Sequence, residues 1–222
     1  MEIGKIVRPS EKLVEGFRNL ATSTIGNVLD DMNIQGIIPN IKSVSPGFRF
    51  AGGAVTVKEV TGGLGTYTNE DFTLGQVIDS AQEGDVIVID NSGQQVSTWG
   101  GIASFAAKMG GVAGLVVDGG VRDLDEIVEF KFPVFSRYVV PTSGKGRIKI
   151  LSMNTVITID GVRVRPGDIM VGDGTGIVCV PIEAAEEVLT LATKYDRQDK
   201  QGIEEIRKGL SFTDALKKFA KI

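Results

Sequence analysis

The chain has 222 residues, of which 42% are hydrophobic and 23% charged, so it can bury a full globular core. A formal charge of −4 and a pI near 5.0, with no dense Lys/Arg block, argue against a nucleic-acid partner. The sequence has no histidine, which excludes Ser-His-Asp catalysis, Cys-His catalysis and histidine zinc sites. Any metal would be a hard cation, Mg²⁺ or Mn²⁺, held by oxygen atoms. No signal peptide or long apolar span is recognisable, so we expect a cytoplasmic protein with no membrane partner.

The first part of the chain predicts helices alternating with strands. Apolar residues recur at helical spacing after Ser10, which predicts a helix with Ser10 as its N-cap. We expect a strand over 52–60 and then a helix over 72–84 that ends at Gly84. The glycine cluster at 62–66 lacks the spacing and context of a dinucleotide-binding loop, so we expect no nucleotide site there.

A Gly-Asp pair precedes an apolar run that ends in Asp at two places, 83–90 and 166–173. The pattern favours a tight turn that leads into a buried strand, with a ligand role for Asp85 and Asp168 as the alternative. The single cysteine, Cys179, lies in an apolar run without an adjacent basic residue. This context indicates a buried structural thiol rather than a reactive one.

The middle of the chain is rich in glycine. The segment 91–101 is expected to be a loop, and its free N–H groups suit either an anion cradle or a simple mobile turn. A helix over about 101–109, a strand over 113–118 and a turn at Gly119-Gly120 are expected to follow. A short helix then begins at Asp123.

The last third of the chain predicts a hairpin and then helices. Alternating residues around Asp160-Gly161 give the strongest hairpin signal in the sequence. From about residue 183 we expect a helical extension, made of a charged amphipathic helix, a break at Gly209 and a short final helix. Because helices and strands are interspersed, the predicted fold class is α/β, with parallel crossovers and antiparallel hairpins in a single domain over 1–222.

Two adjacent charged residues, Arg122 and Asp123, follow the glycine-rich strand and admit two interpretations. Asp123 with Glu126 fits the Asp-x-x-Glu pattern of a capping box at a helix start. Alternatively, the pair lies in a loop at the carboxyl end of a strand, where open α/β sheets bind ligands, and Arg122 grips a carboxylate. The two roles are compatible because a cap uses only one carboxylate oxygen.

Several sequence blocks occur together and in order over about residues 20–182. They read GNVLDDM, PGFRFAGGAVTV, EGDVIVID, WGG, GVAGLVVDGGVRDLDEI, FPVFSR and VRPGDIMVGDGTGIVCVP. On these blocks the chain resembles the 4-hydroxy-4-methyl-2-oxoglutarate aldolase and RraA-like family. The resemblance implies a swivelling-domain-like mixed α/β/β/α sandwich, assembled as a homotrimer or hexamer with active sites at subunit interfaces.

Enzymes of this family are divalent-metal pyruvate aldolases that also decarboxylate oxaloacetate. The resemblance therefore implies a lyase that acts on a small 2-oxo acid with Mg²⁺ or Mn²⁺ as its cofactor. By the same resemblance Asp123 is a catalytic metal ligand, and Arg122 holds the carboxylate or keto oxygen of the substrate. Asp199, from the C-terminal helix of a neighbouring subunit, corresponds to a carboxylate that completes the water shell of the metal.

The resemblance also assigns a substrate cradle to the segment after Trp99. Gly100 and Gly101 lead to the amides of Ile102 and Ala103, which would bind the pyruvate part of the substrate. Active aldolases carry an acid that twenty residues separate from the Arg-Asp pair, at the position where this chain has Gly101, and Asn27 stands where Asp is usual. The lost carboxylate is expected to weaken metal binding or proton handling. The alternative function is a non-catalytic regulator that binds a ribonuclease or another protein, as some relatives do.

Overall fold

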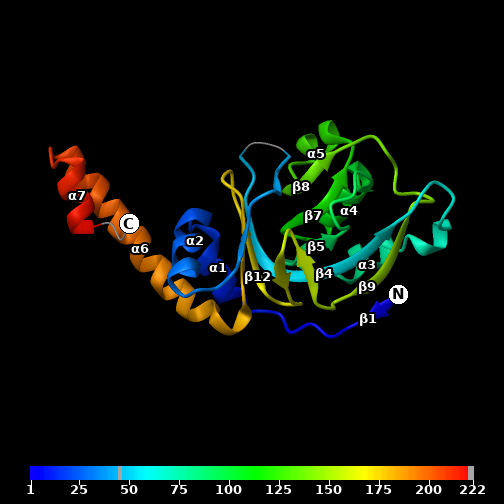
Figure 1. Ribbon diagram of the computed structural model, residues 1–222, viewed down its shortest axis with the longest axis horizontal. Coiled ribbons are helices and arrows are strands. Elements are labelled where there is room, and N and C mark those ends of the chain that lie inside the picture. The colour runs from blue at the N-terminus through cyan, green and yellow to red at the C-terminus, as the bar shows by residue number, and fades with distance from the viewer. Residues whose placement is uncertain (45–46, 220–222) are drawn as a thin grey trace.

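The computed structural model describes residues 1–44 and 47–219 of the chain (Figure 1). Its strands are β1 (Glu2–Ile3), β2 (Ile37–Ile38), β3 (Lys42–Ser43), β4 (Phe50–Thr61), β5 (Val86–Asp90), β6 (Ser97–Trp99), β7 (Gly114–Val121), β8 (Val134–Val139), β9 (Ile148–Met153), β10 (Ile157–Ile159), β11 (Val162–Val164), β12 (Ile169–Gly172) and β13 (Ile177–Val180). Its helices are α1 (Glu11–Arg18), α2 (Thr22–Asp31), α3 (Leu74–Ser80), α4 (Gly101–Met109), α5 (Leu124–Phe130), α6 (Ala185–Arg207) and α7 (Phe212–Phe219), with short 3-10 helices η1 (Asn69–Asp71) and η2 (Ile182–Ala184).

The long strand β4 joins the two halves of the main sheet, whose order is β2-β13-β12-β4-β5-β7-β8-β3. Its start pairs antiparallel with β12, where Phe50 faces Gly172. Its middle pairs parallel with β5, and its end pairs antiparallel with β9. Because β4 changes partners along its length, the sheet folds over into two stacked layers.

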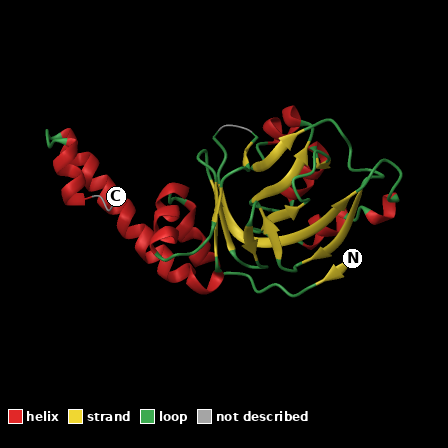
Figure 2. Ribbon diagram, in the orientation of Figure 1, coloured by secondary structure: helices red, strands yellow, loops and turns green. Residues whose placement is uncertain are grey.

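Helices cover both outer faces of these layers, as Figures 1 and 2 show. One outer core lies between α1, α2 and α6 and the strands β12 and β13. The other lies between α3, α4 and α5 and the strands β5 and β7. A third cluster, which includes Phe50, Val88, Phe135 and Met170, fills the space between the two sheet layers. The predicted α/β class and the mixed α/β/β/α sandwich are therefore confirmed.

The predicted caps and turns that are made by residues close together in the sequence are present in the structure. The Ser10 side chain accepts a hydrogen bond from the Leu13 amide at 3.3 Å, as expected of an N-cap. Asp160 and Gly161 have φ angles of 49° and 85°, which build the predicted tight turn between β10 and β11. Gly209, with φ of 102°, breaks the helical extension, which projects away from the sandwich in Figure 1.

The helix expected over 72–84 is shorter in the structure. It is α3, which ends at Ser80, and Ala81 already has extended backbone angles. The Asp85 carboxylate accepts a hydrogen bond from the Gln82 amide at 2.8 Å and holds this segment in a turn. Gly84 therefore belongs to the turn before β5 and does not close the helix.

The turn expected at Gly119-Gly120 is also wrong, because β7 continues through both glycines to Val121. A Cβ on Gly120 would lie 2.9 Å from the Val96 carbonyl oxygen, so only glycine permits this close approach of backbone segments. The expected loop over 91–101 likewise contains a short buried strand, β6, that pairs with β7.

The two Gly-Asp motifs have the structural role that the sequence favoured. Asp85 pairs with Arg8 at 2.8 Å, and Asp168 accepts hydrogen bonds from the amides of Arg165 and Ile182. Cys179 is buried, and burial raises the pKa of its thiol, which confirms a structural thiol. Over residues 1–44 and 47–219, no helix combines the length and apolar character needed to span a bilayer.

Candidate active site

Two parallel strands bring the predicted site segments together. Trp99 at the end of β6 faces Val121 at the end of β7, and the Arg122 amide donates a hydrogen bond to the Trp99 carbonyl at 2.9 Å. Beyond these ends the chain continues as Gly100-Gly101 into α4 and as Arg122-Asp123 into α5. The site thus lies at carboxyl ends of parallel strands, where α/β sheets commonly bind ligands.

Asp123 occupies the position before α5 but does not cap that helix with its side chain. Its backbone is left-handed, with φ of 57° and ψ of 46°, which is uncommon for a residue other than glycine. This conformation directs the carboxylate toward α4, where Oδ2 accepts a hydrogen bond from the Gly101 amide at 3.2 Å. The Arg122 Nε lies 3.5 Å from the same oxygen. The capping-box interpretation is therefore wrong, and the carboxylate lies at the start of the neighbouring helix.

Both glycines of the WGG motif lie against carboxylates. A Cβ on Gly100 would overlap Asp123 Oδ2, and a Cβ on Gly101 would overlap Glu126 Oε2. Glu126 therefore occupies the space of the acid that the family pattern places at position 101. Both parts of this exchange are visible in the sequence. It has a glycine at position 101, where the family pattern has an acid, and it has a glutamate, Glu126, three residues after Asp123.

The first turn of α4 supplies hydrogen-bond donors to the same place. The amides at the start of a helix have no acceptor within that helix, and the helix dipole favours negative charge there. These amides belong to Gly101, Ile102 and Ala103. The side chains of Arg122 and Asp123 are 47% and 37% exposed, so a ligand can reach them from solvent. The site thus combines the Arg122 guanidinium, the Asp123 carboxylate and the N–H donors at the start of α4. The guanidinium and the N–H donors suit the carboxylate of a ligand, and the Asp123 carboxylate suits a metal ion.

A pocket of about 350 Å³ contains all six residues predicted around Arg122, from Gly100 to Ala103 and the Arg122-Asp123 pair. The volume is that of a small-metabolite site. Its remaining walls come from β6, from Ser143-Gly144 and from the segment Phe72–Asp79, which includes α3.

The donor set fits a hard divalent cation. Asp123 and Glu126 both direct carboxylate oxygens to the Gly100-Gly101 segment. Mg²⁺ is commonly held by one or two carboxylates, with water and substrate oxygens completing its octahedron. Within the described ranges, no group of three or more acidic, histidine or cysteine side chains is arranged around a common point. The geometry therefore suits an open Mg²⁺ or Mn²⁺ site rather than a closed structural one.

Two further residues named by the resemblance lie elsewhere in this chain. Asn27 is on α2 and Asp199 is on α6, both in the outer helical layer opposite α4 and α5. The resemblance placed Asp199 on a neighbouring subunit, so its role as a metal ligand stays a prediction.

A buried acid behind the pocket escaped the sequence analysis. Glu59 on β4 is 1% exposed, and its Oε1 accepts a hydrogen bond from Thr98, which lines the pocket, at 2.6 Å. Among the described residues its Oε2 has no hydrogen-bond partner. Burial raises the pKa of Glu59 to about 8, so this carboxyl is neutral at pH 7. An alternating strand pattern gives no sign of such burial.

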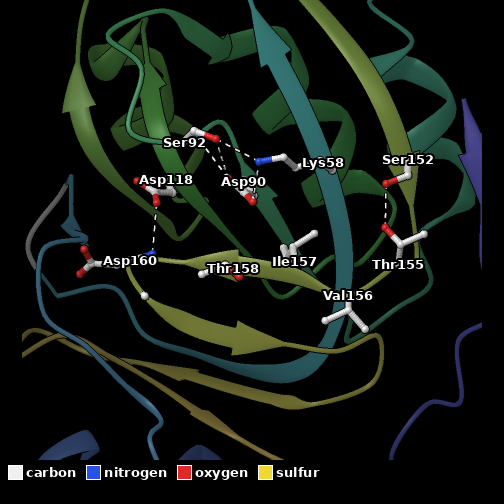
Figure 3. A pocket seen from close by; sticks show the side chains of 11 residues that line it. Lys58, Asp90, Ser92, Asp118, Ser152, Thr155, Val156, Ile157, Thr158 and Asp160 are labelled. Carbon is white, nitrogen blue, oxygen red and sulfur yellow. Dashed lines mark hydrogen bonds and ion pairs between the residues drawn. The ribbon is translucent and has the colours of Figure 1, made fainter.

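A larger pocket of about 660 Å³ lies beside the β10–β11 hairpin (Figure 3). Its charges are already paired within the chain. Lys58 Nζ lies 2.8 Å from Asp90, and Arg137 bridges Asp118 at 2.6 Å and Asp160 at 2.7 Å. Six of the residues that the sequence proposed for function, Gly100 to Ala103 and the Arg122-Asp123 pair, lie instead in the smaller pocket.

Comparison with known proteins gives consistent results. A family model described as RraA-like, Aldolase/RraA, matches residues 24–179. An uncharacterised protein of Methanocaldococcus jannaschii is 35% identical over 150 residues, which are 67% of this chain and 72% of that protein. A provisionally named 4-hydroxy-4-methyl-2-oxoglutarate aldolase of Halalkalibacterium halodurans is 32% identical over 185 residues, 83% of each chain.

Solved structures share the fold over nearly the whole chain. A Pseudomonas syringae pv. tomato protein superposes with a TM-score of 0.84 at 32% identity, covering 94% of this chain and 98% of that chain. Streptomyces coelicolor RraAS2, described as an unusual member of the RNase ES inhibitor RraA protein family, has a TM-score of 0.77 and covers 93% and 100%. Its identity is 24%, so that likeness concerns the fold alone.

Proposed function

The chain belongs to the RraA-like family, and from this premise we propose that it is a divalent-metal-dependent lyase that forms pyruvate. The reactions are retro-aldol cleavage of a 4-hydroxy-2-oxo acid, decarboxylation of oxaloacetate, or both. The aldolase name of the Halalkalibacterium halodurans relative supports a carbon–carbon lyase. The observation that carries the proposal is the convergence of Asp123 and Glu126 on the first turn of α4, next to Arg122.

Each group of the site has a separate role that follows from its chemistry. Asp123 and Glu126 would hold the cation, and Mg²⁺ or Mn²⁺ supplies Lewis-acid stabilisation of the negative charge that develops on the 2-oxo group. Arg122 presents a planar fork of donors to the substrate carboxylate. The amides of Ile102 and Ala103 add donors at a helix N-terminus. The hydrogen bond from Gly101 fixes the orientation of the Asp123 carboxylate in advance.

The bonds exchanged follow from this arrangement. In the retro-aldol reaction the bond between C3 and C4 breaks and its electron pair stays on C3, in conjugation with the 2-oxo group. The C4 hydroxyl loses its proton to solvent, and the departing fragment becomes an aldehyde or ketone. C3 then takes up one proton, which gives pyruvate. In decarboxylation of oxaloacetate the departing fragment is CO₂, and the protonation of C3 that gives pyruvate is the same.

The proposal is tested by a panel of oxo acids assayed for pyruvate release with and without Mg²⁺. Release should require the metal, and Asp123→Asn should lower it at least ~100-fold while keeping the fold, since Asn tolerates left-handed backbone. Asp123→Ala should also abolish release. Asp125→Asn, which changes an exposed carboxylate in the first turn of α5, is the matched control. Metal-independent turnover, or full activity of the Asp123 variants, would refute the proposal.

We expect the assembly to be the homotrimer or hexamer that the resemblance implies. One face of α4 exposes apolar side chains at helical spacing, with Ile102 87%, Phe105 50% and Met109 71% exposed. Such a ridge suits contact with another protein chain. Light scattering on the purified protein measures the oligomer, and Met109→Glu should lower its mass if this ridge is the interface.

A second candidate is the non-catalytic regulator, supported by the fold shared with RraAS2, whose description names a ribonuclease inhibitor family. It predicts capture of a ribonuclease by the purified protein. The Asp123→Asn variant separates the two functions, because it should keep such binding and lose pyruvate release. Capture of no ribonuclease by a correctly assembled protein would count against this candidate.

A further inference from the structure

The back wall of the pocket that contains Arg122 and Asp123 is enclosed by this chain alone. Thr98 on β6 lines the pocket and is 2% exposed, and Glu59 on β4 lies behind it and is 1% exposed. Side chains buried this completely within one chain keep their neighbours when subunits associate across the open side of a pocket. The Glu59–Thr98 pair is therefore part of the site in any assembly.

The elements packed around Glu59 offer it no ion pair among the described residues. Its neighbour Lys58 pairs with Asp90 of β5 at 2.8 Å. Strand β9, which pairs with this part of β4, contributes Lys149, and that lysine pairs with Asp71 at 3.0 Å. Strand β6 has no ionisable side chain. The ionisable residues that line the pocket are Asp79, Arg122 and Asp123.

The Glu59 carboxyl is therefore suited to the neutral form. Among the described residues, Oε1 has Thr98 as its hydrogen-bond partner and Oε2 has none. A buried carboxylate with one hydrogen bond and no cation is strongly disfavoured, whereas the neutral acid is tolerated. Burial raises the pKa of Glu59 to about 8, more than the hydrogen bond to Thr98 lowers it.

The hydrogen bond between Glu59 and Thr98 can run in either direction, because the neutral acid has a hydrogen of its own. On Oε2 this hydrogen would have no acceptor among the described residues. On Oε1 it is donated to Thr98 Oγ1, which lies 2.6 Å away. The hydroxyl hydrogen of Thr98 is then free to be donated into the pocket. A neutral Glu59 thus makes Thr98 a donor at the back of the site.

Resting on the proposed function, we propose that Glu59 supplies, through the Thr98 hydroxyl, the proton that C3 takes up when pyruvate forms. The O–H bond of the acid breaks and its proton passes to Thr98 Oγ1, while the hydroxyl proton of Thr98 passes to C3. The electron pair left on C3 by the broken C–C bond forms the new C–H bond. Glu59 becomes a carboxylate that accepts a hydrogen bond from Thr98, and it recovers a proton from solvent by the same route.

Exchange of the methyl protons of pyruvate with D₂O, followed by NMR, measures this transfer in reverse. Removal of a proton from C3 requires an ionised Glu59, since the carboxylate is the form that accepts it. With Mg²⁺ present, exchange by the wild-type protein should therefore rise with pH and level off above about pH 8.

Two matched changes interrupt the transfer. Glu59→Gln keeps a hydrogen bond to Thr98 but cannot ionise, so it should slow exchange ~100-fold at pH 8 and abolish the rise with pH. Thr98→Val keeps the side-chain shape without the hydroxyl and should slow exchange similarly, whereas Thr98→Ser restores the hydroxyl and should retain most of the rate. Thr56→Val is the control. Thr56 is also on β4 and 0% exposed, and its hydroxyl donates to the Thr155 carbonyl at 2.6 Å, outside this pocket.

Pyruvate binding separates proton transfer from a structural role. The only tryptophan of the chain, Trp99, lines the pocket, so its fluorescence reports occupancy. Glu59→Gln and Thr98→Val should bind pyruvate with Mg²⁺ as tightly as wild type does, because the transfer follows binding. Loss of binding in parallel with exchange would show a structural role and overturn the inference.

The same exchange measurement distinguishes this inference from the function on which it rests. If wild type exchanges with Mg²⁺ and Glu59→Gln has the same rate and pH profile, the inference is wrong and the proposed function stands. If wild type shows no exchange that depends on Mg²⁺, the proposed function fails and the inference fails with it.

Discussion

The carboxylate of Glu126 fills the space that a side chain at position 101 would occupy, since a Cβ on Gly101 would overlap Glu126 Oε2 and lie 2.9 Å from Glu126 Cβ. The glycine and the glutamate are therefore one structural feature. An acid that the family pattern places on α4 is supplied instead from α5. On this basis Gly101 need not signify a loss of activity.

An exchange of the two positions tests this relationship. Glu126→Ala should lower Mg²⁺ affinity or kcat/KM ~10–100-fold, the range seen when a residue that supports a metal site is removed. Gly101→Asp alone introduces a clash and a like charge, so it should also impair the protein. The double variant Gly101→Asp/Glu126→Ala removes the clash and restores one acid, and should be more active than either single variant. Magnesium titration and pyruvate release measure both effects, with Glu129→Ala as the control. A double variant no better than the worse single variant would contradict the exchange.

Arg122→Lys distinguishes a bidentate grip from simple charge attraction. Lysine keeps the positive charge but not the planar fork of donors. We expect KM for the 2-oxo acid to rise about tenfold or more, with a smaller fall in kcat, because the lost contact is made in the ground state as well. Arg165→Lys is a matched control, since its side chain is 43% exposed, close to the 47% of Arg122, and it lies outside the site. An unchanged KM would show that Arg122 does not hold the carboxylate in this way.

The parts of the fold that the sequence predicted correctly depend on neighbouring residues. The Asp160-Gly161 turn and the Ser10 cap are set by local backbone and side-chain chemistry. Gly119 and Gly120 resemble a turn in sequence, but they lie in β7, where the Val96 backbone approaches Gly120 too closely for a side chain. Only tertiary packing shows this requirement.

The site was predictable in position but not in orientation. The Arg122-Asp123 pair after a buried strand and the WGG segment were both identified from sequence. The left-handed backbone of Asp123 and its contact with Gly101 depend on the pairing of β6 with β7, and β6 was not predicted. Glu59 was missed because the partner of its carboxyl group, Thr98, is far away in the sequence.

Arg137 holds together two acids beside the larger pocket, Asp118 at 2.6 Å and Asp160 at 2.7 Å, whose side chains are only 8% and 9% exposed. Arg137→Met should lower the free energy of unfolding by ~3–5 kcal/mol at pH 7, because it leaves two largely buried carboxylates without a partner of opposite charge. Burial alone would raise the pKa of Asp160, but hydrogen bonds from Arg137 and Asn40 lower it below 3.8.

The pH dependence of this effect has a definite sign. A carboxylate with a lowered pKa stabilises the fold above its ordinary pKa of 3.8, and this contribution is lost as pH falls through the lower folded value. The difference between wild type and Arg137→Met should therefore shrink below about pH 4. Urea unfolding at pH 7 and pH 3 measures it. An equal difference at both pH values would show that the ion pairs are not its cause.

Glu59 should make the protein less stable as pH rises. Burial raises its pKa from 4.5 to about 8, so between these values the unfolded chain is ionised at this position while the folded chain keeps its proton. The contribution of Glu59 to the free energy of unfolding is fully present below pH 4.5 and is lost as pH rises through 8.

Glu59→Gln keeps an acceptor for Thr98 and cannot ionise. The free energy of unfolding of this variant, relative to that of wild type, should therefore rise by an amount on the order of a few kcal/mol between pH 5 and pH 8. Chemical unfolding across this range measures the gain, and Glu129→Gln, an exposed glutamate on α5, should show none. A stability difference that does not change with pH would mean that Glu59 is ionised in the folded protein.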